Sequence, residues 1–360
     1  MNIFESTNQY ETWLESLTHI DRAEIKIKHE NMSSSPFIFL RATYYRWAQV
    51  WTKRCEKESR APTIMAVGDL HVENYGTWRD AEGRLNWGVN DFDEASHLPY
   101  TNDLIRLATS AQLAIGANHL SVSIKDACDA ILKGYTTAVK AGGAAFVLEE
   151  QHAWLRSAAL SELRSPPQFW KKLDSLSTWM GDIPDSAAHA LVQGMPEPDL
   201  QYRVVHRIAG EGSLGRMRFT AIASWHGSMI AREVKPIVQS AATWAVPEAG
   251  PREILYDTIA ARSIRSPDPF LQLNGQWIIR RLAPHTSRIE LADLSPSRDE
   301  LALLKAMGAE AANVHLGTPG AAKGIGAHLK EQNKSWLIDA SAKMSESVID
   351  EWRTWRDRKK

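Results

Sequence analysis

The sequence predicts an α+β protein with two lobes, a helical lobe early in the chain and a smaller antiparallel β lobe later. In residues 1–200, apolar side chains recur mainly at helical spacing, as in the series Phe39, Tyr44 and Trp47. In residues 201–295, apolar and polar side chains alternate as they do in half-buried strands. Residues 296–360 return to helical spacing, so we expect them to rejoin the helical lobe.

Short strands and prolines interrupt the first, helical part. The expected helices cover residues 8–30, 37–57, 102–120, 122–142 and 145–164. Ser33–Ser35 and Pro36 supply the N-cap and first turn of the second helix. Residues 61–67 and Leu85–Val89 are apolar runs that we interpret as strands. Several prolines between residues 166 and 198 predict a region of linkers before the β segment.

The β segment begins after residue 201. Met217, Phe219 and Ala221 alternate with polar neighbours, and His226-Gly227 is a plausible hairpin tip. Beyond it we expect a helix at 251–265, a strand at Trp277–Leu282, and helices at about 298–316 and 327–356.

Composition excludes several classes of protein. In 360 residues, 42 Lys and Arg stand against 43 Asp and Glu, a net charge of -1, so no general basic surface for nucleic acid is expected. Cys55 and Cys128 are too few for a disulfide framework or a zinc site. Residues 1–13 include Glu5 and Glu11 and no apolar stretch, so we expect no signal peptide, and the sequence contains no run of roughly 18 apolar residues. We expect a cytoplasmic protein without nucleic-acid or membrane partners, of an oligomeric state that the sequence does not reveal.

The segment VGDLHVENYGTWRDAEGRLNWGVNDFDEA, residues 67–95, carries the strongest functional signal. Asp69, Asn74, Asp91 and Asp93 lie at the loop ends of its two apolar runs. Mg²⁺ is usually held by one or two carboxylates together with substrate phosphates. In phosphoryl transfer, one carboxylate orients the nucleophile while an amide and a second carboxylate hold the metal. Taken singly, the same residues also suit turns and helix caps.

Two residues, one within this segment and one after it, have simpler structural explanations. His71 belongs to a residue type that more often packs than binds a ligand. Asp103, at the start of the next expected helix, suits the positive end of the helix dipole, and it is also placed to brace the loop that carries Asp69.

A second signal lies in the β segment, at Gly210-Glu211-Gly212-Ser213-Leu214-Gly215. A G-x-G-x-x-G sequence alone is weak, and a dinucleotide-binding loop would lead into a helix. A strand pattern follows here, which fits a glycine loop that folds over nucleotide phosphates. Lys235, 20 residues after Gly215, has the position of a phosphate-binding lysine, and Glu253 on the next expected helix is its expected partner. A hairpin turn and a surface lysine are the alternatives.

These motifs together resemble known families. VGDLHVENYG, VNDFDEA and NDLIRLATS resemble the Asp-Leu-His-x-x-Asn loop, the Asp-Phe hairpin and the Asp-Leu helix of aminoglycoside phosphotransferases and choline kinases. The wider set KHENMSSSPFIFLRA, GDLHVENYG, NDFDEA, DLIRLATS, GEGSLG and REVKP is similar to a bacterial family catalogued as domain of unknown function 2252, over about residues 26–320.

The resemblance implies a protein-kinase-like fold with assigned roles. It implies Asp69 as catalytic aspartate, Asn74 and Asp91 as metal ligands, and Gly210–Gly215 with Lys235 as phosphate binders. Kinases place the glycine loop before the catalytic loop, whereas this chain has them in the opposite order. The resemblance therefore implies a circularly permuted fold.

Two positions depart from the kinase pattern. Val67 stands where kinases usually carry the His of His-x-Asp, which puts the internal bracing of the loop in question. Glu233-Val234 replaces the usual small residue before the lysine.

The expected function is ATP- and Mg²⁺-dependent phosphoryl transfer to a hydroxyl or amine. Asp69 is expected to accept or orient the acceptor proton, and His71 to donate a hydrogen bond to the transferring group, with Asp93 as a further metal ligand. Only about nine residues separate Asp91 from the next helix, too few for a long peptide-binding segment, which favours a small-molecule acceptor. We expect the acceptor pocket within helices of residues 105–200.

Three alternatives remain open from the sequence. Gly-Asp-x-His also opens metallophosphoesterase sites, although the further histidine clusters of such sites are missing. A catalytically degenerate nucleotide-binding protein is the second alternative, and transfer of the nucleotide instead of the phosphoryl group is the third.

Overall fold

Helices and strands both build the protein, as the predicted α+β class requires. The computed structural model describes residues 1–149, 152–162, 165–246, 253–286 and 300–358. Its helices are α1 (Ile3–Glu15), α2 (Arg22–Asn31), α3 (Pro36–Ala42), α4 (Tyr44–Arg54), η1 (Glu58–Arg60), α5 (Thr101–Gly116), α6 (Ile124–Ala141), α7 (Ala153–Glu162), α8 (Pro166–Asp174), α9 (Asp185–Gly194), η2 (Glu211–Ser213), α10 (Ala241–Ala245), α11 (Tyr256–Arg262), α12 (Glu300–His315), α13 (Ala321–Glu331) and α14 (Trp336–Asp357). Its strands are β1 (Thr63–Ala66), β2 (Tyr75–Arg79), β3 (Leu85–Val89), β4 (Ser96–Pro99), β5 (Arg203–His206), β6 (Phe219–Trp225), β7 (Ser228–Pro236), β8 (Gln272–Asn274) and β9 (Trp277–Leu282).

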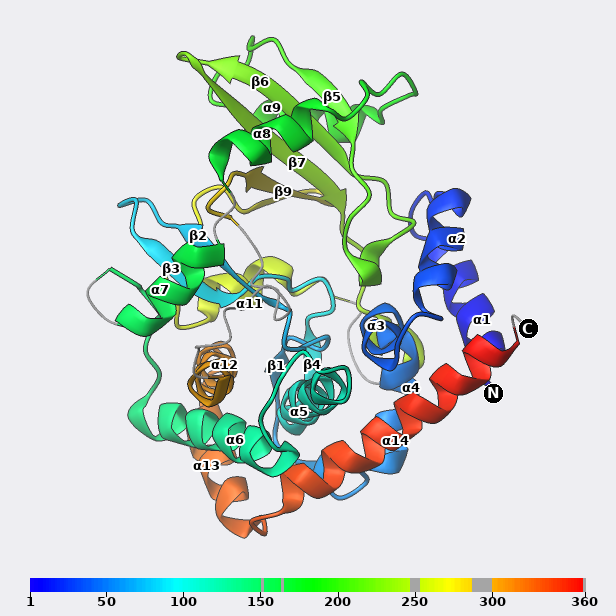
Figure 1. The fold of residues 1–360 in the computed structure, drawn as a ribbon, viewed down its shortest axis with the longest axis vertical. Coiled ribbons are helices and arrows are strands. Elements are labelled where there is room, and N and C mark those ends of the chain that lie inside the picture. Colours follow the sequence, from blue (N-terminus) through cyan, green and yellow to red (C-terminus); the bar gives the residue numbers. More distant parts are fainter. Residues whose placement is uncertain (150–151, 163–164, 247–252, 287–299, 359–360) are drawn as a thin grey trace.

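The predicted β segment forms a five-stranded antiparallel sheet in the order β5-β6-β7-β9-β8. Figure 1 shows this sheet at one end of the molecule, above the helical part. Two smaller antiparallel pairs hold the motif segment of residues 67–95: β1 and β4 flank it and pair with each other, and β2 and β3 form a hairpin within it. The motif loops therefore lie between the helical part and the large sheet.

Two long helices predicted near the N-terminus are each divided. Residues 8–30 were expected as one helix, but α1 ends at Glu15 and α2 begins at Arg22. The Asp21 side chain accepts the backbone N–H of Ala23 and of Glu24, so it caps a new helix. In the same way, the predicted helix 37–57 is divided at Thr43 into α3 and α4.

The proline-rich region contains helices that the sequence analysis missed. Pro166 is the first residue of α8, a position where proline favours a helix, and Pro184 directly precedes α9. Both helices pack on the large sheet, α9 through Ala187 and Leu191 and α8 through Leu173. The last two helices of the region expected to form the helical lobe, α8 and α9, therefore pack on the large sheet. The helix expected at 145–164 starts only at Ala153.

The helical core is built around α5, α6, α12 and α14. Helices α6 and α12 cross closely because Gly134 and Gly308 lie at the contact: a methyl group on Gly134 would come within 1.8 Å of the Lys305 carbonyl oxygen. This close crossing places His315, at the end of α12, beside Asp103 at the start of α5. The predicted C-terminal helix 327–356 is two helices, α13 and α14, and the chain between them is not helical.

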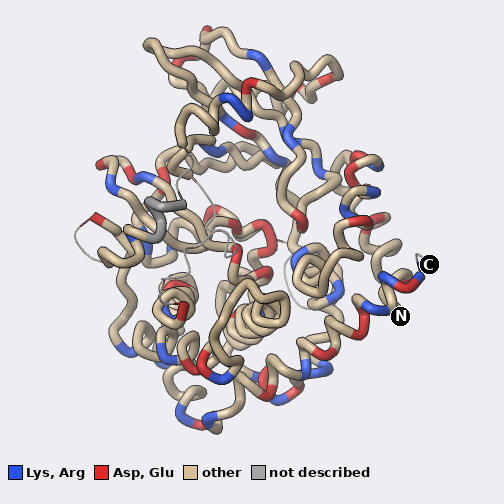
Figure 2. Tube along the Cα trace, viewed as in Figure 1, with Lys and Arg blue, Asp and Glu red and all other residues tan. Residues whose placement is uncertain are grey.

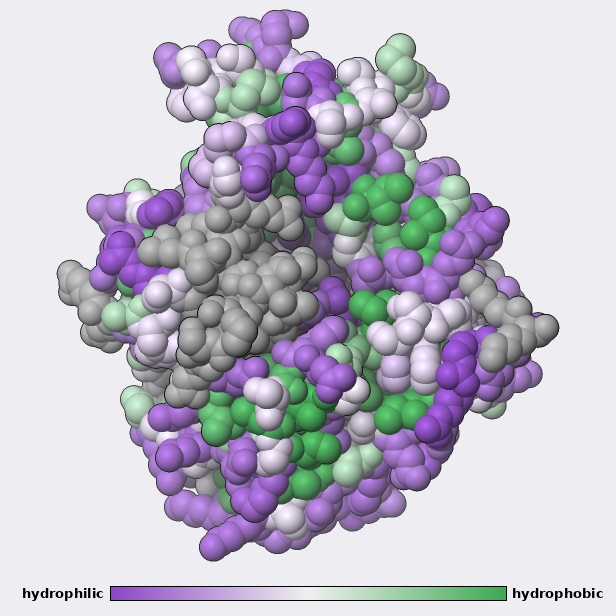
Figure 3. Space-filling model, in the orientation of Figure 1, coloured by the Kyte–Doolittle hydropathy of each residue, from purple (hydrophilic) through white to green (hydrophobic). Residues whose placement is uncertain are grey.

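Most of the described surface seen in Figure 3 is hydrophilic, with apolar side chains in separate groups. Among the described residues, no helix combines the length and the apolar character that a membrane crossing requires.

Candidate active site

A buried carboxylate, that of Asp103, fixes the backbone of the turn after β1. Asp103, at the start of α5 and fully buried, accepts the backbone N–H of Val67 at 2.7 Å and of Gly68 at 3.0 Å. His315 lies 3.0 Å from the same carboxylate, and its other ring nitrogen lies 2.8 Å from the hydroxyl of Tyr135. The expected bracing role of Asp103 is confirmed.

Gly68 gives this turn its shape. Its φ of 80° lies in the left-handed region, and a side chain there would come within 2.3 Å of the Glu94 carbonyl oxygen. The glycine therefore lets the β1 turn approach the loop after β3 closely, and Asp69 follows it directly.

Asp69 is held by an arginine that the sequence analysis missed. Arg106, on α5 and fully buried, donates from Nε to Asp69 Oδ1 at 2.7 Å and from Nη2 to the Leu40 carbonyl at 2.9 Å. Its guanidinium also lies 5.0 Å from the ring centre of Tyr44. Burial raises the pKa of Asp69 above its ordinary value, because the lowering effect of Arg106 is smaller. Its position in the sequence gave no signal of this role, because α5 carries several other polar residues.

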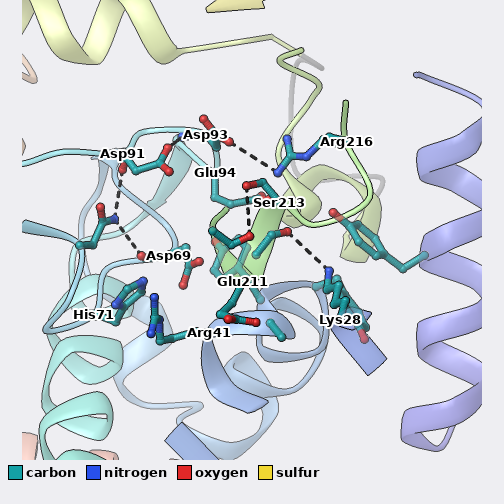
Figure 4. Close-up of a pocket in the computed structure, with 17 residues that line it drawn as sticks. Lys28, Arg41, Asp69, His71, Asp91, Asp93, Glu94, Glu211, Ser213 and Arg216 are labelled. Carbon is teal, nitrogen blue, oxygen red and sulfur yellow. Dashed lines mark hydrogen bonds and ion pairs between the residues drawn. The ribbon is translucent and has the colours of Figure 1, made fainter. Parts of the chain in front are cut away.

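Asn74 connects the two motif loops. Its side-chain nitrogen donates to the backbone carbonyls of Asp69 and Asp91, each at 3.1 Å, as the dashed lines of Figure 4 mark. This fixes the amide, so that its oxygen Oδ1 is buried without a hydrogen-bond partner among the described residues. His71 lies beside it, and its Nδ1 accepts the backbone N–H of Glu73 at 3.2 Å.

The loop after β3 carries the acidic cluster. Asp91 Oδ1 accepts the backbone N–H of Asp93, and Asp93 Oδ1 is buried without a hydrogen-bond partner in the described part of the chain. Unmatched oxygens of Asn74 and Asp93 beside Asp91 form the donor set that Mg²⁺ prefers. The residues present therefore fit a hard divalent cation.

Lys235 lies against this acidic cluster. It is 1% exposed, at the end of β7, and its ammonium forms a short ion pair with Asp93 and lies 3.7 Å from Asp91. Burial lowers the pKa of Lys235 to about 8, although both aspartates raise it. Arg216, also buried, lies 3.5 Å from Asp93. Figure 2 shows Lys and Arg on strands of the sheet nearest the helical part, with Asp and Glu on the central loops below.

Glu233, two residues before Lys235, is buried as a charged group because arginines pair with it. It is fully buried on the same face of β7 as Lys235, and it pairs with Arg207 at 2.7 Å and with Arg218 at 3.2 Å. Burial alone would raise the pKa of Glu233, but Arg207, Arg218 and Arg280 lower it to about 2. The departure at this position is therefore compensated by arginines of the sheet.

The glycine loop folds into the same cavity as the motif loops. A methyl group on Gly212 would lie 3.2 Å from the Arg41 carbonyl oxygen and 3.7 Å from Asp69 Oδ2. The cavity is lined by Asp69, His71, Asn74, Asp91 and Asp93 together with Gly210, Gly212 and Ser213. Two motifs more than 100 residues apart in the sequence thus meet in one place (Figure 4).

Helix α2 holds the glycine loop from outside. Glu24 accepts the N–H of Gly215 at 3.0 Å, and the N–H of Asp21 donates to the Gly215 carbonyl at 2.8 Å. Glu24 also forms a short ion pair with His206, and this pairing raises the pKa of the histidine. The loop is therefore fixed at its second end by the N-terminal segment.

Some expected contacts are not formed. Glu253 is exposed and lies in a non-helical segment before α11, because that helix begins only at Tyr256. Lys235 pairs with the aspartates, and no ion pair between Lys235 and Glu253 occurs in the described structure. Residues 105–200, where the acceptor pocket is expected, do not line this cavity: its lining comes from residues 10–45, 69–94 and 210–216.

The site and the fold together define an α+β protein with an acidic, oxygen-rich cavity between a helical part and an antiparallel sheet. Residues 21–168 match the family described as "Uncharacterized protein conserved in bacteria (DUF2252)". The matched stretch agrees with the resemblance that the motifs indicate, but it covers less than half of the chain: it includes residues 67–95 and α5 and ends before the glycine loop. No curated protein and no solved structure matches the chain.

Proposed function

We propose that the protein is an ATP- and Mg²⁺-dependent phosphotransferase that acts on a hydroxyl or amine of a small molecule. The observation that carries this proposal is the meeting of Gly212 with Asp69 in one cavity, beside Lys235 on Asp91 and Asp93. A glycine loop, a buried lysine and paired carboxylates are the parts that position and neutralise phosphates in phosphoryl transfer.

Each residue has a defined task in this proposal. Asn74, Asp91 and Asp93 would hold Mg²⁺, which supplies charge neutralisation for the phosphates. The backbone of Gly210–Ser213 and Lys235 would bind those phosphates. Asp69, oriented by Arg106, would accept the acceptor proton.

His71 would donate a hydrogen bond to the transferring group. Its Nδ1 accepts a backbone N–H, so Nε2 carries the ring proton in the neutral form. His71 also lines the cavity. The raised pKa of Asp69 brings this carboxylate closer to the range useful for a general base.

A circularly permuted kinase-like fold is part of the proposal. The order β5, glycine loop, β6 and β7 with its lysine is that of the nucleotide lobe in kinases, and the helical part with Asp69 precedes it. Asp103 beneath the β1 turn supports the same comparison, because it fixes the backbone on which Asp69 depends.

The cavity must open to admit a nucleotide. Its volume is about 50 Å³, whereas small-molecule sites usually measure about 300–1,000 Å³. The glycine loop narrows the cavity, since Gly212 is in contact range of Arg41 and Asp69. Binding therefore requires the loop to move away from the β1 turn.

A metallophosphoesterase is less well supported. In the described residues, the one triad of His, Asp and Glu groups close enough to share a metal is Asp21, Glu24 and His206. It lies on the α2 side of the glycine loop, and both of its carboxylates already have partners: Asp21 caps α2, and Glu24 accepts the N–H of Gly215. His71 is the one histidine of the cavity lining.

Calorimetry tests the proposal at its first step. Wild-type protein is expected to bind ATP only with Mg²⁺ present, and Asp69→Ala is expected to retain this binding while turnover falls at least about 1,000-fold. ATP labelled at the α or the γ phosphate then separates nucleotide transfer from phosphoryl transfer. Absence of Mg²⁺-dependent ATP binding refutes the proposal, and binding without transfer to any acceptor supports a degenerate protein.

A further inference from the structure

Lys28 is a buried cation that the proposed mechanism has not used. It lies on α2, is 3% exposed, and lines the cavity. Its ammonium donates to the Gly212 carbonyl oxygen at 3.5 Å, a long hydrogen bond, and lies 5.8 Å from the ring centre of Tyr45. A buried charge without a partner is costly, so buried lysines normally have an anion beside them.

No carboxylate of the described chain forms an ion pair with Lys28. Glu11, Glu94 and Glu211 are near enough to raise its pKa, but burial and Arg216 lower it, and the result is about 8. The three donors of a lysine ammonium are thus matched here by one long bond to a neutral carbonyl. An anionic ligand in the cavity would supply the missing partner.

The position of Lys28 indicates which anion this is. Lys28 and Asp69 both lie against Gly212, so the tip of the glycine loop separates the lysine from the proposed proton acceptor. Figure 4 shows Lys28 pointing to the loop from the side opposite to Asp69 and Asp91. The group that is transferred must lie beside Asp69. Lys28 is the buried cation on the opposite side of the glycine loop, and it would face that group when the loop moves to admit a nucleotide.

We propose that Lys28 binds the terminal phosphoryl group of the nucleotide, and so distinguishes a nucleoside triphosphate from a diphosphate. This inference rests on the proposed function. Lys235, which is paired with Asp91 and Asp93, would contact the phosphates next to the metal ion. Lys28 would contact the terminal phosphate. A compact ammonium suits a phosphate oxygen as a point charge.

The test compares the affinities of two nucleotides by calorimetry. Wild type, Lys28→Met, Lys28→Arg and Lys26→Met are titrated with Mg·ADP and with a non-hydrolysable Mg-bound ATP analogue. Lys26 lies on the same helix but is exposed, so its variant controls for loss of charge on α2. We expect Lys28→Met to weaken the triphosphate roughly 10- to 100-fold and the diphosphate less than threefold. Lys28→Arg should recover part of the loss, and Lys26→Met should behave as wild type.

Stability provides a second readout from the same variants. Without ligand, Lys28→Met removes a buried unpaired charge, so its melting temperature should equal or exceed that of wild type. Equal weakening of both nucleotides, unchanged binding, or unfolding of Lys28→Met would overturn the assignment. If wild type binds both nucleotides but Lys28→Met weakens them equally or leaves both unchanged, the assignment alone fails. If wild type binds neither nucleotide, the proposed function fails and the assignment with it.

Discussion

The ion pair between Arg106 and Asp69 yields a prediction whose size follows from burial. Replacing Arg106 with Met keeps most of the volume on α5 but leaves the Asp69 carboxylate without its cation. Asp69 keeps a side-chain exposure of 18%, so water reaches only part of it, whereas Arg106 has none. The variant therefore holds a carboxylate that burial already disfavours and that keeps only the weaker favourable effect of Arg41.

Removing one partner of a buried ion pair costs about 3–5 kcal/mol. Unfolding entropy of about 2.1 cal/mol/K per residue gives roughly 0.8 kcal/mol/K for a chain of 360 residues. We therefore expect Arg106→Met to lower the melting temperature by about 4–6 °C at neutral pH.

The sign of the pH dependence follows from the raised pKa of Asp69. A carboxylate with a raised folded-state pKa binds its proton more tightly in the folded protein, so stability falls as pH rises from the unfolded value near 3.8 to the folded value. Arg106→Met raises that folded value further. The stability gap between wild type and variant should therefore be small near pH 4 and widen toward neutral pH.

Thermal melts across this pH range measure the effect, with two further variants as controls. Asp69→Asn combined with Arg106→Met removes both charges and should recover most of the lost stability. Arg46 and Glu351 form a similar two-donor ion pair away from the cavity, partly exposed at 13% and 21%. Arg46→Met should cost about 1 kcal/mol or less. A gap that does not depend on pH, or a double variant as unstable as the single one, refutes the reasoning.

Two further predictions concern the charges around the cavity. Lys235→Met should weaken Mg·ATP binding roughly 10- to 100-fold, yet strengthen Mn²⁺ binding without nucleotide at least about tenfold, because the lysine no longer competes for Asp91 and Asp93. Titration of Mn²⁺ by electron paramagnetic resonance measures this, and an unchanged Mn²⁺ affinity would contradict it. The raised pKa of His206 predicts stabilisation that is complete below about pH 6.5 and lost as pH rises through the raised value. His206→Gln should therefore be less stable than wild type at pH 6 and nearly equal at pH 9 in thermal melts, and a constant difference would count against the Glu24 pairing.

Much of the fold and site followed from local sequence patterns. The strand at Leu85–Val89 and the strand at Trp277–Leu282 have the predicted bounds, and the β segment after residue 201 is antiparallel as expected. Asp69 and Gly212 were each singled out from spacing within one short segment. These features depend on neighbours in the sequence, which a single chain displays directly.

Features that depend on distant contacts could not be predicted in this way. Lys28 and Arg106 belong to helices whose pattern reads as ordinary, and only the folded chain brings them to Gly212 and Asp69. The pairing of Lys235 with Asp93 instead of Glu253 is of the same kind, since it depends on where β7 ends relative to the β3 loop. Prolines also have two meanings: Pro166 starts a helix, but the same residue type marks linkers elsewhere.

Most charged side chains around the cavity are already paired with one another, and this has a consequence for the order in which ligands bind. Asp93 is paired with Lys235, Asp69 with Arg106, and Lys28 rests on a loop carbonyl. A divalent cation alone would have to displace Lys235 and leave it buried and unpaired. A triphosphate alone would bring negative charge beside Asp91 and Asp93. Each step by itself creates an uncompensated buried charge, whereas the metal–nucleotide complex supplies both signs together. On the proposed function, the protein therefore binds the metal–nucleotide complex as one ligand, and the glycine loop opens for that complex.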